Sequence, residues 1–510
     1  MKIIQRIGLF TFLGGFAAFL CLLTVGQYTL TDNILKTNLK AEHYAVLQPS
    51  LKNMVGKTYT DQFSFVADFN APINALNDGY RAKQEWNKVI YDKYAFAVTK
   101  ASSGGFAWSW WFLVSFGLAV VGALTYILPT TRWLPGIKNN GIFREAATSR
   151  GWVGISVGVF LVLFYIVLYF GPEYITNWVL LVDPISRALS GNAATQWFLY
   201  GFLYCLCVVI MGIRMLIKYR HSPYQMLRTG SVMFFQLAIA FILPELLLRF
   251  NLPYFDFKNM WPLDYDFFFD YNLNALLASG KIGIFMLGWG IALFVVGVPV
   301  MTYFFGKRWY CSWVCGCGGL AETLGDPFRQ LSNKTLKVWK IERYLIHFVL
   351  AFAVIMTSLV LYTYFTGRSS VLFLDSYSVR SWYGFYVGAI FSGVVGTGFY
   401  PVMGNRVWCR FGCPLAAYLG LVQKYQSRFR ITTNGGQCIS CGNCSTYCEM
   451  GIDVRAYAQR GQDIVRSSCV GCGVCSSVCP RGVLNLENAD PKSRVLLAPN
   501  YPLGHFITKP

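Results

Sequence analysis

Long apolar runs dominate the hydrophobic pattern of the chain. A helix needs about 20 mostly apolar residues to cross the hydrocarbon core of a bilayer. Eight segments meet this condition, near residues 7–29, 106–128, 152–173, 196–217, 231–250, 280–305, 344–366 and 382–403. The first resembles the apolar core of a signal peptide, but no clean small-residue cleavage site follows it, so we expect an uncleaved helix. The pattern predicts an all-α polytopic membrane bundle of about eight transmembrane helices.

The charges between the spans predict an orientation. Basic residues gather in alternate loops: Arg132, Lys138, Arg144 and Arg150, then Lys218, Arg220 and Arg228, then Lys307, Arg308, Arg329, Lys334, Lys337, Lys340 and Arg343. Loops rich in Lys and Arg stay in the cytoplasm. We therefore expect both termini to be cytoplasmic in a multi-pass protein of the bacterial cytoplasmic (inner) membrane. The intervening loop 251–279 is acidic and aromatic, and would be the landing site for a redox partner on the outer face.

The spans divide the chain into segments. We expect a first transmembrane helix at 1–29, an outward-facing soluble segment at 30–105, transmembrane helices 2–6 at 106–305, a cytoplasmic loop with a Cys-x3-Cys motif at 306–343, transmembrane helices 7–8 at 344–403, a cytoplasmic Cys-x3-Cys-Pro segment at 404–432, a 2[4Fe–4S] ferredoxin domain at 433–490 and a C-terminal tail at 491–510.

Composition supports a membrane protein and excludes one class of partner. Hydrophobic residues make up 55% of the chain and charged residues 13%, against roughly 25% charged residues in soluble domains. The net charge of +20 lies in short loops beside the spans, where it favours anionic lipid. We therefore expect the lipid bilayer, and no nucleic acid, as a partner.

Cysteine spacing carries the clearest chemistry. Of sixteen cysteines, eight fall in two runs of Cys-x2-Cys-x2-Cys-x3-Cys, at 438–448 and 469–479. In two-cluster ferredoxins, three cysteines of one run and the last cysteine of the other hold each [4Fe–4S] cluster. Cluster one would be bound by Cys438, Cys441, Cys444 and Cys479, and cluster two by Cys469, Cys472, Cys475 and Cys448. Zinc also binds Cys-x2-Cys pairs, but it does not require the repeated run or the ending Cys479-Pro480. The spacing predicts an α+β domain of the bacterial ferredoxin type, in which Glu449 replaces the proline expected after Cys448.

An internal repeat carries a second set of cysteines. Residues 306–315 match 404–413 in their Gly, Arg, aromatic and Cys-x3-Cys positions. Thiols four residues apart share one face of a helix, so Cys311, Cys315, Cys409 and Cys413 are candidates for a further metal site or a dithiol relay. Arg308 and Arg406 would favour their thiolates. The alternative is that these cysteines only pack helices, as small hydrophobic residues do. We assign no catalytic residue.

The ferredoxin run, the preceding spans and the paired motifs, over about residues 280–490, resemble the NosR-type and NapH-type family of membrane-bound 4Fe–4S, polyferredoxin-like proteins. Cys409-Arg-Phe-Gly-Cys413-Pro414 matches the family motif, whereas Cys315 is followed by Gly316-Cys317. The resemblance implies electron transfer in anaerobic respiration, between the cytoplasmic side or the quinone pool and a membrane or periplasmic partner. The chain would then be an electron-transfer component of an oxidoreductase, such as a quinol dehydrogenase subunit.

The same motifs are compatible with a second function, and they bear on other cofactors. Proteins of the CcoG type share this plan, so an alternative is a reductase that supports maturation of copper or haem enzymes. We find no covalent-flavin motif, and expect no covalent flavin. Of four histidines, only His347 lies in a span, so we expect no bis-histidine haem. Because all predicted centres lie on one side, either a quinone docks within the bundle or a partner supplies an outer cofactor.

Overall fold

The structure is a computed structural model of the 510-residue chain. It describes residues 2–83, 88–90, 92–104, 108–136, 151–371, 374–434 and 437–488. The predicted tail 491–510 and the loop residues Lys138, Arg144 and Arg150 lie outside the described residues. The chain divides into two compact units, which are described separately: Met1–Trp133 with Leu163–Leu203, and Leu134–Val162 with Tyr204–Pro510.

Within the described residues, seven helices are long and apolar enough to cross a membrane: Lys2–Thr24, Ser109–Arg132, Trp152–Phe170, Gln196–Lys218, Pro223–Arg249, Gly280–Phe305 and Leu336–Thr366. They confirm the mostly helical membrane fold and seven of the predicted spans. The eighth, 382–403, is not among them. It is a helical path with five glycines, continuous from α19 (Ser376–Trp382) through the π-helical η10 (Tyr383–Val395) to α20 (Gly396–Gly398), and followed after Phe399 by α21 (Tyr400–Met403).

In the first unit, two apolar helical segments pack with their backbones in close contact. α1 (Lys2–Cys21), followed by η1 (Leu22–Thr24), lies against α6 (Trp108–Phe112), η3 (Leu113–Gly117) and α7 (Leu118–Ile127), which continues into η4 (Leu128–Arg132). A Cβ added to Gly122 would lie 2.3 Å from the backbone nitrogen of Phe12, and one added to Gly15 would lie 2.5 Å from that of Ala119. Small residues at such positions let apolar helices approach closely.

The same unit holds a small subdomain with its own core. Its sheet has the order β2-β1-β3, with β1 (Gln27–Thr29), β2 (Thr58–Tyr59) and β3 (Ser103–Gly104) antiparallel. Around it lie α2 (Asp32–Asn38), α3 (Ala41–Leu51), α4 (Gln62–Ala82), α5 (Asp92–Ser102), η6 (Pro172–Ile175) and α9 (Thr176–Ser190). Tyr28, Phe65 and Phe69 are fully buried in its core.

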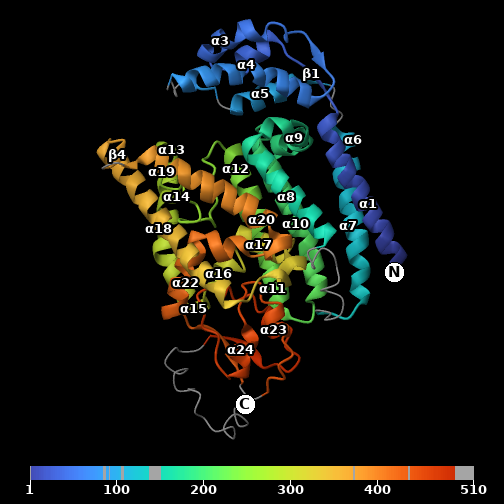
Figure 1. Cartoon of the computed structure of the whole chain (residues 1–510), viewed down its shortest axis with the longest axis vertical. Coiled ribbons are helices and arrows are strands. Elements are labelled where there is room, and N and C mark those ends of the chain that lie inside the picture. The colour runs from blue at the N-terminus through green and yellow to red at the C-terminus, as the bar shows by residue number, and fades with distance from the viewer. Residues whose placement is uncertain are drawn as a thin grey trace. The chain divides into compact units, whose positions relative to one another are not determined.

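The second unit contains the rest of the helical bundle (Figure 1). Two helices contribute residues to both units, α8 (Trp152–Phe170) and α10 (Gln196–Lys218). The others are α11 (Pro223–Phe234), η7 (Phe235–Ile242), α12 (Leu243–Arg249), α13 (Asp270–Ala278), α14 (Gly280–Ala292), η8 (Leu293–Gly297), α15 (Val298–Phe305), α16 (Arg308–Cys311), α17 (Gly316–Glu322), η9 (Asp326–Leu331), α18 (Leu336–Thr366), α19–α21, η11 (Trp408–Gly412) and α22 (Pro414–Gln426), with a hairpin of β4 (Ser370–Val371) and β5 (Leu374–Asp375).

Residues 251–269, between α12 and α13, fold back into the bundle. Met260 is 1% exposed and belongs to the same buried cluster as the cysteines of the repeat. The indole nitrogen of Trp261 donates to Thr357 Oγ1 on α18 at 2.9 Å. Part of the predicted landing site 251–279 therefore packs in the interior, where its aromatic residues avoid water, whereas Tyr254 and Tyr271 are more than half exposed. That this loop receives a redox partner stays a prediction.

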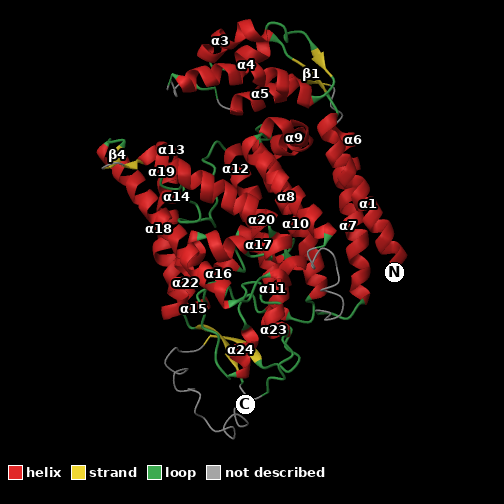
Figure 2. Cartoon of the chain, in the orientation of Figure 1, coloured by secondary structure: helices red, strands yellow, loops and turns green. Residues whose placement is uncertain are grey.

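The C-terminal domain is small and mixed (Figure 2). β6 (Phe429–Thr433) pairs antiparallel with β7 (Leu484–Asn488), and Phe429 lies opposite Asn488. Between them lie α23 (Asn443–Thr446), α24 (Val454–Gln459) and α25 (Val474–Ser477). Both cysteine runs lie between the two paired strands in the sequence, so the pairing brings them into one domain. Each run leads into a short helix.

Candidate functional site

The eight cysteines of the C-terminal domain line two separate pockets. Cys438, Cys441, Cys444 and Cys479 line one, and Cys448, Cys469, Cys472 and Cys475 line the other. Each pocket takes three cysteines from one run and the last cysteine of the other. The same grouping follows from the spacing of the cysteines in the sequence.

The backbone around these pockets suits anionic sulfur. Ser440 and Gly442 in the first run and Gly471 and Gly473 in the second have positive φ, at equivalent positions. These turns expose N–H groups, and the N–H of residue 483 lies 3.4 Å from Cys479 Sγ. Hydrogen bonds to sulfur are a main means by which a protein stabilises an iron–sulfur cluster and sets its potential.

Burial also favours metal-bound sulfur. It raises the pKa of the Cys444 and Cys469 thiols to about 11, so neither is a thiolate near neutral pH without a nearby positive charge. A coordinating metal ion supplies that charge and deprotonates the thiol. The residues present therefore fit two [4Fe–4S] clusters, each held by four cysteines, where each cluster would accept and return one electron.

The two pockets differ in their surroundings. The first faces away from the bundle, since Cys441 is exposed and Ile439 is 55% exposed. The loop of the second is held by four side chains of the bundle, each donating to a backbone carbonyl at 2.8 Å: Tyr224 to Gly471, Gln225 to Cys472, Gln423 to Cys469 and Ser312 to Val470. The second pocket is thus the one next to the helices.

The cysteines of the repeat do not share helix faces as predicted. Cys311 is the last residue of α16, whereas Cys315 is the N-cap of α17 in an extended conformation. Cys409 lies in the π-helical η11, and Cys413 caps α22. The chain reverses within each Cys-x3-Cys motif, because the second cysteine starts a new helix.

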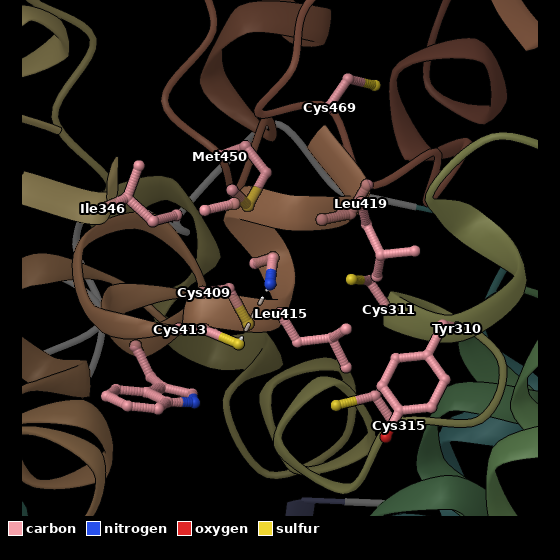
Figure 3. Close-up of a cluster of buried hydrophobic side chains, with 14 of the residues drawn as sticks. Tyr310, Cys311, Cys315, Ile346, Cys409, Cys413, Leu415, Leu419, Met450 and Cys469 are labelled. Carbon is pink, nitrogen blue, oxygen red and sulfur yellow. Dashed lines mark hydrogen bonds between the residues drawn. The ribbon is translucent and has the colours of Figure 1, made fainter. Parts of the chain in front are cut away.

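The four thiols nevertheless converge. All are about 5% exposed and belong to one buried cluster. Figure 3 shows Cys409 and Cys413 on one side of Leu415 and Cys311 and Cys315 on the other, with their sulfurs turned toward one another. Cys317, which the sequence left without a role, donates a hydrogen bond to Cys315, and with the N–H of Gly318 this lowers the pKa of Cys315 to about 6.

The predicted role of the two arginines is right for one and wrong for the other. Arg406 Nη1 lies 3.7 Å from Cys409 Sγ, and its charge opposes the effect of burial on that thiol. Arg308 instead lies 4.4 Å from the Phe429 ring and 3.3 Å from Asn488 Oδ1, against the ferredoxin domain. Motif position alone did not distinguish them, since the difference comes from residues distant in the sequence.

A buried charge network links the two cysteine sites. Arg406 pairs with Glu322 at 2.6 Å and Glu449 at 3.1 Å, and Arg329 pairs with the same two carboxylates at 2.6 and 2.8 Å. Arg329 Nη1 also lies 4.0 Å from Cys472 Sγ. Sequence reasoning missed this network. Its signal was Glu449, the residue that breaks the proline position of the ferredoxin pattern.

Comparisons with known proteins agree with this chemistry. A family described as "4Fe-4S binding domain" matches residues 287–335 and 383–432, the two halves that contain the repeat, and "4Fe-4S dicluster domain" matches 430–480. A protein of Escherichia coli (strain K12) described as "Putative electron transport protein YccM" is 27% identical over 156 residues, which are 29% of this chain and 43% of YccM. The match thus spans less than half the length of that relative. No solved structure matches the chain. The chain therefore carries 4Fe–4S binding domains, and the narrower NosR and NapH resemblance stays a prediction.

Proposed function

We propose that this protein passes electrons between the cytoplasmic side or the quinone pool and a membrane or periplasmic redox partner. It would work in the bacterial cytoplasmic membrane during anaerobic respiration, with both termini in the cytoplasm. The observation that carries the proposal is the grouping of eight cysteines into two pockets, one exposed and one held against the bundle. An exposed first cluster would meet a soluble partner, and the second would communicate with the membrane.

The residues between the sites support a route. Cys472 at the second pocket and Cys409 in the bundle each lie beside a guanidinium, and these two guanidinium groups share Glu322 and Glu449. All four charged groups are at most 4% exposed on their side chains. Arg228 also pairs with Glu322, and Arg329 with Asp326, which pairs in turn with Arg214 and Lys218. The five cations and three carboxylates of the whole network leave a net positive charge. That charge would stabilise the reduced, more negative state of a neighbouring cluster.

The thiols of the repeat supply a second element of the proposal. Cys311, Cys315, Cys409 and Cys413, with Cys317, form a soft donor set that suits zinc, copper(I) or iron–sulfur chemistry. A metal held there would continue the route from the clusters into the bundle. The same donor set favours the alternative function, a reductase that supports maturation of copper or haem enzymes, because copper(I) prefers thiolates.

Metal analysis and EPR of the purified, dithionite-reduced protein test these proposals. We expect about eight irons and two interacting cubane signals per chain. The matched variants are Cys469→Ser/Cys472→Ser, which should lose one cubane signal, and Cys409→Ser/Cys413→Ser, which should keep both and lose any metal beyond them. Copper in wild type that disappears in the second variant would favour the alternative function. Absence of cubane signals from wild type would overturn the main proposal.

A further inference from the structure

A cavity of about 250 Å³ lies in the second unit, separate from both cysteine pockets. Residues 258–265 of the segment that folds back into the bundle form one wall, and the eighth helical path contributes Tyr383 and its neighbours. The remaining wall comes from both copies of the repeat at equivalent positions, Tyr310 with Trp408 and Gly316 with Pro414. The cavity therefore lies where the two copies meet, beside the convergent thiols.

The lining is aromatic and rich in hydrogen-bond donors. Tyr265, Tyr310, Tyr383 and Trp408 surround the space, and Lys258 brings an ammonium whose side chain is 9% exposed. Asp256 Oδ2 lies 2.8 Å from Lys258 Nζ and holds it in place. No carboxylate is among the lining residues that the structure describes, which disfavours a cation. The walls suit a flat ring that bears oxygen acceptors.

Trp408 adds an independent indication of a ligand. It is 7% exposed, yet within the described part of the chain its indole nitrogen has no hydrogen-bond acceptor. A buried indole N–H usually has a partner, because leaving it unpaired costs about 1–3 kcal/mol. An acceptor oxygen on a molecule in the cavity would remove this cost.

The size of the cavity limits the ligand. Pockets for drug-sized molecules enclose roughly 300–1,000 Å³, so about 250 Å³ admits one single-ring or fused two-ring headgroup and is small for a nucleotide. Tyr265 packs closely against glycines of the eighth helical segment: a Cβ on Gly388 would lie 3.0 Å from the Tyr265 hydroxyl. Glycines of this segment thus make room for Tyr265 in the cavity wall.

We infer that this cavity binds the ring of a quinone or quinol and is the site where it exchanges electrons with the protein, an inference that rests on the proposed electron-transfer function. Lys258 and Trp408 would donate hydrogen bonds to its oxygens. In the oxidising direction both O–H bonds of the quinol break and both C–O bonds become C=O. Each of the two predicted clusters would take up one of the two electrons, past Cys317 in the cavity wall, and the two protons would be released to solvent.

Equilibrium binding of a tail-free quinone to the full-length protein in detergent tests the site. The probe is 2,3-dimethyl-1,4-naphthoquinone, and the readouts are its Kd, the iron content and the rate at which its quinol bleaches the cluster absorbance. Lys258→Met and Trp408→Phe should each raise Kd about tenfold or more, since each removes a buried hydrogen bond to the ligand. Their controls are Lys337→Met and Trp382→Phe, exposed residues of the same kinds, which should stay within about twofold of wild type.

The outcomes separate this inference from the proposed function. Wild-type protein with full iron that does not bind the quinone would overturn the inference and leave the clusters intact. Equal Kd values in wild type and in iron-replete Lys258→Met and Trp408→Phe would overturn this location for the site. If both variants fail to fold, Ser392→Phe, which fills the cavity from another wall, should abolish binding, and retained binding would count against the site. Quinone binding without iron in wild type would support the cavity and contradict the proposed function.

Discussion

The two copies of the repeat have similar backbone conformations around the second cysteine. In each, the N–H of the second cysteine donates to the carbonyl of the aromatic residue five positions earlier, Cys315 to Tyr310 at 2.8 Å and Cys413 to Trp408 at 2.9 Å. In each, that cysteine then caps a new helix, α17 or α22. Both aromatic residues also line the same cavity. Local sequence similarity has therefore produced equivalent local structure.

The copies differ in their electrostatics. Arg406 of the second copy is fully buried between Glu322 and Glu449 and lies against a thiol. Arg308 of the first copy is half-buried and lies over Phe429 of the ferredoxin domain. The same motif residue thus contributes charge to the thiol site in one copy and docking to the domain in the other. Motif equivalence predicts conformation, whereas the role of a charge depends on its tertiary neighbours.

Replacing the two arginines should give the largest contrast. Arg406→Met leaves two buried carboxylates with less counter-charge, and should lower the free energy of unfolding by about 3–5 kcal/mol. Arg308→Met loses its partly exposed contacts with the Phe429 ring and Asn488 Oδ1, and should cost about 0.5–1 kcal/mol. Thermal and denaturant unfolding of the detergent-solubilised variants measures both. Equal losses would contradict the assigned difference.

Acid should weaken the surroundings of the first copy through Asp326, which follows α17. Burial alone would raise the pKa of this carboxyl, but Lys218 at 2.7 Å, Arg214 at 2.8 Å and Arg329 hold it well below its usual range. A lowered folded-state pKa gives stability that is fully present above the unfolded-state pKa of about 3.9 and is lost as the pH falls toward the folded value.

Melting temperatures between pH 6 and pH 3 measure this effect. Wild type should lose stability more steeply below about pH 4 than Asp326→Asn, which is less stable at neutral pH but flatter in acid. Asp78→Asn, at an exposed acid whose side chain is 74% exposed, should keep the wild-type slope. An Asp326→Asn profile parallel to wild type would mean that the carboxyl titrates alike in both states.

Replacing the glycine that begins each copy should lower the free energy of unfolding by similar and smaller amounts. Gly306 and Gly404 have φ of +67° and +93°. An added Cβ would lie 2.7 Å from Phe429 Cδ1 in the first case and 2.3 Å from Ser332 Oγ in the second. Either change to Ala should cost about 1–3 kcal/mol. Gly230→Ala, in α11 with no atom near the new Cβ, should instead be neutral or stabilising. A loss at only one copy would show that their turns are not equivalent.

Replacing Pro414 should have the smallest effect on the free energy of unfolding. It is the first residue of α22, where a proline is compatible with the helix start, and Gly316 holds the equivalent position in the first copy. Pro414→Ala should lower the free energy of unfolding by up to about 1 kcal/mol, because it frees the unfolded chain. Urea unfolding measures it, and a loss of several kcal/mol would mean that the ring packs in the site.

Local patterns accounted for much of the molecule. The apolar runs predicted seven membrane-spanning helices, because the length and hydropathy of a segment are properties of that segment alone. The eighth predicted segment is helical but is not among these seven, and its glycines allow close packing against Tyr265. The grouping of cluster cysteines was predictable for the same reason, as the spacing within each run limits which sulfurs can surround one pocket.

By itself, the sequence determined the helical membrane fold, the 4Fe–4S domain and the presence of two similar Cys-x3-Cys segments. Only the tertiary structure decided that Cys317 forms a hydrogen bond with Cys315 and that Glu449 forms ion pairs with Arg329 and Arg406. It also decided that residues 251–269 enter the bundle and form one wall of a cavity. The physical reason is range. Hydropathy and ligand spacing act over a few residues along the chain, whereas burial, ion pairing and cavities depend on groups that lie far apart in the sequence and meet only in the folded protein.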